Sequence, residues 1–160
     1  MTQTLRKRRS PSQVLHVRVR RSRAGLGLFA VGRIEKGAFV VEYSGRRIAT
    51  RRARTLTTRY LFELDERVTL DGSSRTNLAR YVNHGCRPNA ESTIRRGRVE
   101  IRAIRTILPG EEVTYDYGEE YFAAFLSRGR CRCSHCARTK DGKTRVRTRA
   151  TPKKAARESR

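Results

Sequence analysis

Short apolar runs, separated by glycine turns, constrain the fold of this chain more than any other feature of its sequence. At the end of the run 14–20, Val17 and Val19 alternate with arginines, which is typical of a half-buried strand. Similar runs cover residues 28–31, 38–43, 60–64, 68–71, 93–101, 101–107 and 112–117, with turns expected at Gly25-x-Gly27, at 34–37, at Gly97 and at Pro109-Gly110. No long amphipathic helix interrupts them, so the pattern predicts a mainly β fold of several small sheets.

Four segments depart from this strand pattern. Residues 46–59 are rich in arginine and poor in apolar side chains, so they form either a short exposed helix or a basic loop. Residues 119–126 are the best helix candidate, because two glutamates stand in the first turn, where the helix dipole favours acids. Residues 1–12 are expected to be a basic arm. Residues 138–160 are rich in Lys and Arg and have too few apolar groups to bury, which predicts a basic disordered tail.

The net charge of +23 at pH 7 is extreme for 160 residues, and it is concentrated at both ends of the chain. The stretch between the ends is basic as well. Clustered Lys and Arg favour an anionic partner, because they displace the counterions condensed on a phosphate backbone. Non-specific contact of the basic tails with nucleic acid is one interpretation, and solvated, self-repelling tails are the other. No helix-turn-helix pattern or Cys₂His₂ spacing supports base-specific readout.

Neither a membrane nor an oxidising compartment is indicated. The sequence has no uninterrupted apolar stretch near the ~20 residues that a membrane span needs, and no secretory apolar core follows its first residues. We therefore expect an intracellular protein, in the cytoplasm or nucleoid, or in the nucleus of a eukaryote. In that reducing setting the four cysteines are metal ligands or free thiols rather than disulfides.

Several short motifs occur together in the second half of the chain. They are Asn-His-x-Cys-x-Pro-Asn at 83–89, Tyr-Asp-Tyr-Gly at 115–118 and Cys-x-Cys-x-x-Cys at 131–136. Upstream blocks at 22–30, 35–37, 42–45 and 60–65 precede them in a matching order. This set resembles the SET-domain protein-lysine methyltransferases. The resemblance implies a SET domain at 13–118 with a knot-like C-terminal crossing, followed by a post-SET segment at 119–137.

The same resemblance implies an S-adenosylmethionine-dependent protein-lysine N-methyltransferase that acts, as a monomer, on a protein presenting a lysine. In this family the cofactor lies against the Gly-x-Gly block, which corresponds here to Ala24, Gly25, Leu26 and Gly27. The aromatic and Asn-His positions beside the cofactor correspond to Tyr60, Asn83 and His84. Without the resemblance, the glycines would indicate a tight turn, Asn83 a loop cap and His84 a structural histidine.

Methyl transfer to lysine needs a neutral amine, although a lysine with its reference pKa of ~10.4 is almost fully protonated at neutral pH. A narrow, apolar tunnel walled by tyrosines favours the uncharged amine and orients it. By resemblance, Tyr117 carries the catalytic hydroxyl, Tyr43 is a channel wall, and Tyr115 occupies a position that is Phe or Tyr in the family. A tyrosine there leaves less room for successive methyl groups and predicts mono- or dimethylation. The alternative for all three is ordinary strand packing.

The cysteine pattern implies, again by resemblance, one structural Cys₄ zinc site formed by Cys86, Cys131, Cys133 and Cys136. The spacing after Cys133 is shorter than in the family's common tail, which leaves His135 as an alternative ligand to Cys136. Gly85 stands where the family usually has Ser. Aromatics near the site, Tyr121 and Phe122, are expected to complete the channel. A reduced surface cluster without metal is the alternative.

Two other functions fit parts of the sequence. One is a basic nucleic-acid or chromosome-binding protein that retains the SET scaffold with little or no turnover; the other is a small-molecule or ribosome-associated methyltransferase. The intact Tyr117, Asn83 and His84 favour an enzyme, because a binding protein could lose them without unfolding. A basic enzyme would repel a free basic histone tail, so its substrate is either less basic or brought to it by an anionic polymer.

Overall fold

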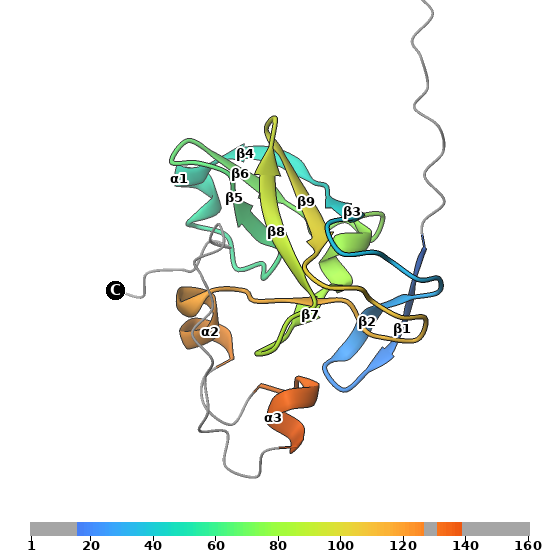
Figure 1. Cartoon of the computed structure of the whole chain (residues 1–160). Coiled ribbons are helices and arrows are strands. Elements are labelled where there is room, and N and C mark those ends of the chain that lie inside the picture. Colours follow the sequence, from blue (N-terminus) through green and yellow to red (C-terminus); the bar gives the residue numbers. More distant parts are fainter. Residues whose placement is uncertain (1–15, 127–130, 139–160) are drawn as a thin grey trace, which may run out of the picture.

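Four small β-sheets form the body of the protein, as the sequence pattern predicts (Figure 1). The computed structural model describes residues 16–126 and 131–138; the expected basic arm at 1–12, and all of the expected tail beyond residue 138, lie outside them. Two of the sheets have two strands each. One is the antiparallel hairpin of β1 (Val17–Ser22) with β2 (Gly25–Ala30), and the other is the parallel pair of β7 (Asn83–His84) with β10 (Thr114–Tyr115). The two three-stranded sheets have the orders β3 (Phe39–Tyr43), β9 (Arg98–Ala103), β8 (Ala90–Arg95) and β4 (Arg46–Ala49), β6 (Val68–Asp71), β5 (Leu61–Glu63).

Helices are few and short in the described part of the chain. They are α1 (Thr50–Ala53), the 3₁₀ turn η1 (Leu78–Tyr81), α2 (Glu119–Phe125) and α3 (Ser134–Arg138). The helix expected at 119–126 is therefore confirmed. Within the described residues, no helix has the length and apolar character needed to cross a membrane.

The arginine-rich segment 46–59 is more ordered than the sequence indicates. It contains the short helix α1, which was one of the two alternatives, but it begins with a strand, β4, which was not expected. Ile48 is the one partly buried side chain of β4, so the strand has almost no apolar pattern to detect. Its pairing with β6, from Arg46 opposite Asp71 to Ala49 opposite Val68, depends on backbone hydrogen bonds that any residue can make.

The expected turn at Gly25-x-Gly27 is wrong by two residues. The chain reverses at Arg23 and Ala24, and both glycines lie within β2, with Gly25 opposite Ser22. Gly25 has φ of +114°, a conformation that side chains rarely adopt. A Cβ at Gly27 would overlap the side chain of Glu112. The glycines therefore allow a bend and a close approach to the strand that follows Pro109.

The β8–β9 hairpin agrees with its prediction. Its two turn residues, Arg96 and Gly97, both have positive φ, 51° and 70°, which is the backbone that a tight two-residue hairpin requires. The last strand is shorter than expected: of the run 112–117, only β10 is a strand, while Glu112 forms an isolated bridge with Phe29. Its parallel pairing with β7 returns the chain beside residues 83–84, and the knot-like crossing stays a prediction.

One hydrophobic core supports all the strands that carry the motif residues. Its largest fully buried side chains include two tyrosines, Tyr43 and Tyr115, each 1% exposed. They are packed among Leu28 of β2, Phe62 of β5 and Ile101 of β9, together with Ile107, Val113, Val82 and Val99. The tyrosines expected in a channel are thus also part of the core, as the strand-packing alternative proposed.

Candidate active site

A cavity of about 560 Å³ collects most of the motif residues that the sequence singles out. Its volume is within the ~300–1,000 Å³ range of sites that bind small molecules. Of the residues expected beside a cofactor or catalytic, Ala24, Leu26, Tyr60, Asn83, His84 and Tyr117 line it. Its other walls come from η1, from α2 and from the cysteine segment, through Arg80, Tyr81, Tyr121, Phe125, Leu126, Cys131, Arg132 and Cys133, with Arg59 and Arg75 from loops.

A hydrogen-bond network fixes the β1–β2 hairpin against Asn83. The Asn83 amide donates both to the backbone oxygen of Leu26, at 2.9 Å, and to Glu112 Oε1, at 2.7 Å. Glu112 Oε2 accepts a hydrogen bond from the Ser22 hydroxyl at 2.9 Å, and the Ala24 N–H points to the same hydroxyl at 3.4 Å. Asn83 therefore joins two strands that are far apart in sequence, which is more than the local loop cap of the alternative interpretation.

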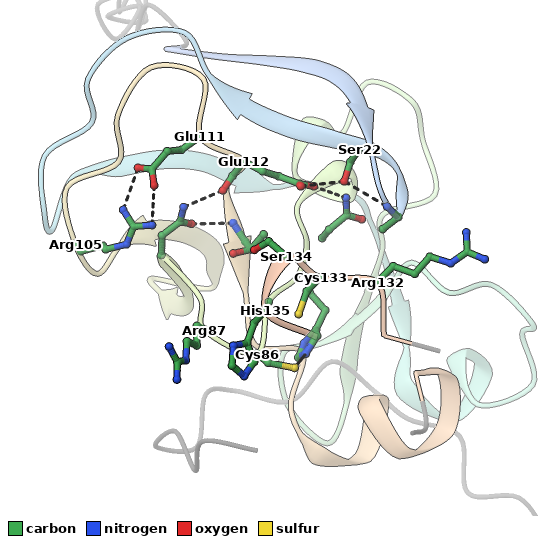
Figure 2. A pocket seen from close by; sticks show the side chains of 16 residues that line it. Ser22, Cys86, Arg87, Arg105, Glu111, Glu112, Arg132, Cys133, Ser134 and His135 are labelled. Carbon is green, nitrogen blue, oxygen red and sulfur yellow. Dashed lines mark hydrogen bonds and ion pairs between the residues drawn. The ribbon is translucent and has the colours of Figure 1, made fainter. Parts of the chain in front are cut away.

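Glu112 is a site residue that sequence reasoning missed. It was treated only as part of a strand, although alternation along the run 112–117 places it on the face opposite Tyr115 and Tyr117. Glu112 and Ser22 line a smaller cavity, shown in Figure 2. Its volume is about 200 Å³, and it shares Asn83 and His84 with the larger cavity. An ion pair of Arg105 with Glu111, at 2.9 Å, lies at the far side of this smaller cavity.

His84 connects the cavity to the cysteines. Its Nε2 lies 3.2 Å from Cys86 Sγ, and its Nδ1 accepts the backbone N–H of Tyr117 at 3.3 Å, with Asp116 Oδ1 3.6 Å away. An accepting Nδ1 implies that Nε2 carries the proton of the neutral ring, so Nε2 donates toward the sulfur. The ring also contacts that of Phe122, with centroids 5.2 Å apart. Both ring nitrogens thus have protein neighbours, as expected of the structural alternative.

The tyrosine hydroxyls differ in their hydrogen bonds. Tyr117 donates to the backbone oxygen of Val82 at 2.7 Å, and Tyr43 to that of Tyr60 at 3.0 Å. The Tyr115 hydroxyl is buried and has no hydrogen-bond partner among the residues that the structure describes. The three rings contact one another in a row: Tyr115 and Tyr117 are tilted, with centroids 4.9 Å apart, and Tyr117 and Tyr121 meet edge to face, with centroids 4.8 Å apart. A buried hydroxyl without a partner is costly, and Tyr115 does not itself line either of the two cavities.

Burial keeps these phenols protonated. Desolvation, and secondarily the neighbouring tyrosines, raise the pKa of Tyr115 and of Tyr117 well above the usual value. Desolvation also raises the pKa of Tyr43, and it raises that of Tyr121 to about 12. At neutral pH Tyr117 is therefore a hydrogen-bonding group and not a phenolate base.

The cavity wall opposite the hairpin is cationic, which sequence reasoning did not detect. The Arg80 guanidinium lies over the Tyr60 ring, 4.0 Å from its centroid, and 5.4 Å from that of Tyr81. The Tyr121 hydroxyl points to the backbone oxygen of Arg59 at 3.4 Å. In a chain with this many arginines, no local pattern distinguishes those that line a cavity. Tyr121 lines the cavity as expected, whereas Phe122 instead packs on His84.

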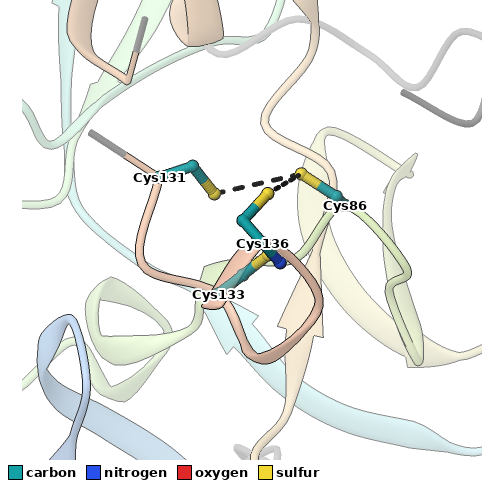
Figure 3. Close-up of side chains that lie close together, drawn as sticks. All are labelled: Cys86, Cys131, Cys133 and Cys136. Atoms are coloured by element: carbon teal, nitrogen blue, oxygen red, sulfur yellow. Dashed lines mark hydrogen bonds between the residues drawn. The ribbon is translucent and has the colours of Figure 1, made fainter. Parts of the chain in front are cut away.

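Four cysteine sulfurs lie together at the edge of this cavity (Figure 3). Their Sγ atoms are all within 4.8 Å of one another; Cys86 lies 3.5 Å from Cys136 and 3.9 Å from Cys131. A tetrahedral zinc with Zn–S bonds of ~2.3 Å would need sulfurs about 3.8 Å apart. The set could therefore hold a metal ion. Among the described residues the cluster contains Cys136 and not His135.

The thiols also have unequal acidity. Hydrogen bonds from Cys131 and from Cys86 lower the pKa of Cys133, and the N–H of Cys136 points to the same sulfur at 3.4 Å. A thiolate is the form of cysteine that binds metals.

Comparisons with known proteins agree with this geometry. Residues 25–118 match the SET domain family. The chain is 40% identical over 105 residues to the "Histone-lysine N-methyltransferase, H3 lysine-4 specific" of Schizosaccharomyces pombe, covering 58% of this chain and 11% of that protein. It is 35% identical over 126 residues to "Histone-lysine N-methyltransferase ASHH1" of Arabidopsis thaliana, covering 71% of this chain and 25% of that protein.

A crystal structure of an active polycomb repressive complex 2 in the stimulated state is similar with a TM-score of 0.59 and 32% identity, covering 65% of this chain and 15% of that chain. The chain thus spans a quarter or less of each of these relatives.

Proposed function

This chain belongs to the SET domain family, and we propose that it transfers methyl groups from S-adenosylmethionine to a lysine side chain of a protein. One observation carries the proposal: a single cavity brings the β1–β2 hairpin and Asn83 together with Tyr117. These residues lie far apart in sequence, and each alone has a structural explanation. Together they supply a hydrogen-bonding cradle beside an oriented phenol.

The residues of the cavity fit the proposed cofactor. The volume suits a molecule of that size, and polar groups of Asn83 and of the backbone at 24–27 stand beside the Tyr60 ring. Arg80, over that ring, suits a carboxylate. Ala24, Gly25, Leu26, Gly27, Tyr60, Asn83 and His84 would hold the cofactor. When bound, it supplies a methyl group activated by a sulfonium. The absence of a side chain at Gly25 leaves open space beside the β2 backbone, so such a ligand can approach it closely, whereas Gly27 makes room for Glu112.

Tyr117 is the proposed catalytic residue. Its hydroxyl donates to the Val82 carbonyl, which leaves the oxygen lone pairs to accept an N–H of the entering amine. Accepting that N–H turns the nitrogen lone pair in a fixed direction, which is the positioning that an in-line displacement needs. Tyr43 and Tyr121 are both buried and exclude water, and burial among such rings lowers the pKa of a lysine. The chain thereby favours the neutral amine.

Tyr115 is proposed to limit the number of methyl groups. Its hydroxyl is buried beside Tyr117 and has no partner among the described residues. A water or the substrate amine can satisfy it, and either occupies space that further methyl groups would need. This supports mono- or dimethylation as the main product.

The four thiols fit one zinc ion in both number and spacing, so we assign Cys86, Cys131, Cys133 and Cys136 as its ligands. The metal would hold the segment 131–138 beside the cavity, in the role of a post-SET segment at 119–137 after a SET domain at 13–118. A monomer remains the expected state. The relatives' names support a histone or another chromosomal protein as the substrate, and a location at the chromosome, in a nucleus or a nucleoid.

A direct test incubates the purified chain with labelled S-adenosylmethionine and core histones, free or assembled on DNA, and locates the label by mass spectrometry. The expected result is mono- or dimethyl-lysine with the wild type and at most a trace with Tyr117→Phe. Calorimetry on the same Tyr117→Phe protein should find cofactor binding retained, because the cradle is unchanged. Absence of methyl-lysine on any protein of a whole lysate, despite measured cofactor binding, would instead favour the binding-protein alternative.

A further inference from the structure

Eight exposed arginines gather at one end of the folded domain, away from the cysteine cluster. They come from two segments that are far apart in sequence, 46–54 and 95–98. In Figure 1 the β8–β9 turn lies beside β4 and near α1, whereas α3 lies at the opposite end of the molecule. We call this surface the arginine face; its members are Arg46, Arg47, Arg51, Arg52, Arg54, Arg95, Arg96 and Arg98.

The fold holds the two segments together. Arg47 Nη2 donates to the backbone oxygen of Gly97 at 2.5 Å, so the β8–β9 turn is fixed against β4. On the other side, β4 leads directly into α1, whose Thr50 N–H donates to the Arg67 carbonyl at 2.9 Å. A charged surface that the fold organises in this way differs from a charged tail, because its cations keep fixed positions.

Carboxylates near the arginine face neutralise only part of it. Three pairs are long, and the arginine of each is well exposed: Arg46 with Asp71 at 3.6 Å, Arg98 with Glu42 at 3.6 Å, and Arg95 with Glu100 at 3.9 Å. Long pairs with a well-exposed guanidinium bind weakly, so these arginines can exchange their carboxylate for another anion. None of the described carboxylates lies within ion-pair distance of the remaining face arginines at 47, 51, 52, 54 and 96.

Two neighbouring acids, Asp65 and Glu66, lie on the β5–β6 turn near α1. The Asp65 carboxylate binds the backbone of its own turn: its Oδ1 accepts hydrogen bonds from the N–H groups of Arg67 and Val68, both at 2.8 Å. The face as a whole keeps an excess of positive charge.

The composition of the face indicates which anion it suits. All its cations are arginines, whose planar guanidinium groups bind phosphates with two parallel hydrogen bonds. Neither of its two segments contains an aromatic residue, so it offers no ring on which unpaired bases could stack. From these observations we infer that the arginine face binds the phosphodiester backbone of duplex nucleic acid, without reading its sequence. Binding there leaves the cavity open, because the face lies at a different end of the domain.

The test compares three triple substitutions of equal charge in the full chain. The first is Arg51→Gln/Arg52→Gln/Arg96→Gln on the arginine face. The second is Arg18→Gln/Arg20→Gln/Arg21→Gln, which replaces three exposed arginines of β1. The third is Arg145→Gln/Arg147→Gln/Arg149→Gln near the C-terminus. Fluorescence anisotropy measures binding to a labelled duplex DNA of arbitrary sequence, a duplex RNA and a single strand, over a series of salt concentrations.

The face triple should weaken duplex binding at least tenfold and reduce the slope of log affinity against log salt by two to three, since each lost phosphate contact contributes about 0.9. The other two triples should change the affinity less than threefold. Equal losses in all three, a larger loss in the C-terminal triple, or preference for the single strand would each overturn the proposal. Thermal unfolding of each variant excludes a folding defect, and methylation of a short peptide, unchanged in the face triple, separates this result from the proposed function.

Discussion

The two walls of the cavity are built by different means. One wall is made by β2, β7 and β10. Strands β2 and β10 contribute Leu28, Ala30 and Tyr115 to the hydrophobic core, and a half-buried network of Ser22, Glu112 and Asn83 joins the β1–β2 hairpin to β7. The other wall, α2 and residues 131–138, has two short helices and contacts the first through aromatic rings and cysteines. Helices of five and seven residues are not stable alone. The fold itself therefore preforms one wall, whereas we expect the other to depend on the zinc ion proposed for its thiols.

Removal of the proposed zinc should have the largest effect, because its thiols join the second wall to Cys86, which follows β7. With Cys86→Ser, or after chelation, we expect methyl transfer to fall to background and residues beyond 118 to become sensitive to protease, while the β-sheet signal in circular dichroism persists. Elemental analysis should find about one zinc per chain in the wild type and little in the variant, as four thiolates close one site. A zinc-free wild type with full activity would refute the ligand assignment.

The next effect in size concerns the preformed wall at its reacting end. Tyr117→Phe removes the hydroxyl held by Val82 while leaving the ring contacts, so we expect turnover to fall on the order of a hundredfold, the usual cost of lost positioning. Zinc content and cofactor affinity should not change. Undiminished turnover would show that Tyr117 is not the catalytic residue and that its ring serves only for packing.

A change in the network that supports this wall should have an intermediate effect. Glu112→Ala leaves the Asn83 amide and the Ser22 hydroxyl without their shared acceptor. This should lower the free energy of unfolding by about 1–3 kcal/mol. We expect cofactor affinity to fall about tenfold, measured by calorimetry, because the β1–β2 hairpin is released. Glu112→Gln is the matched control, since its amide can still bond both neighbours, and it should stay within about threefold. If the two variants behave alike, the network does not position the cradle.

The smallest change is Tyr115→Phe, which removes only one hydroxyl. We expect the rate on a substrate peptide to change less than tenfold and the products to move toward trimethyl-lysine, read from the mass of the peptide with time. Removing a buried, unpartnered hydroxyl should also raise the melting temperature slightly. A mono/di/tri ratio identical to that of the wild type would count against its proposed control of product.

The sequence predicts the preformed wall better than the dependent one. Alternating strands and glycine turns locate nearly every strand of the core, because side-chain burial dictates that pattern. They miss β4, since an edge strand rich in arginine has no apolar period, and β7, since two residues are too few to show one. They also miss Glu112, since its partners Ser22 and Asn83 are far away in sequence. The resemblance to the SET family implied that the four cysteines lie together, but α3 was not expected, because five residues are too few for a periodicity. Arg80 over Tyr60 could not be selected among so many arginines.

The unpartnered hydroxyl of Tyr115 has a consequence for the evolution of this protein. Phenylalanine fits the same ring environment without a buried polar atom, so a chain selected for stability alone would drift toward it. Persistence of tyrosine at this position in orthologues would then record selection for the number of methyl groups delivered, at some expense of folding stability. Lineages that have relaxed this requirement should be recognisable by the substitution of this single oxygen.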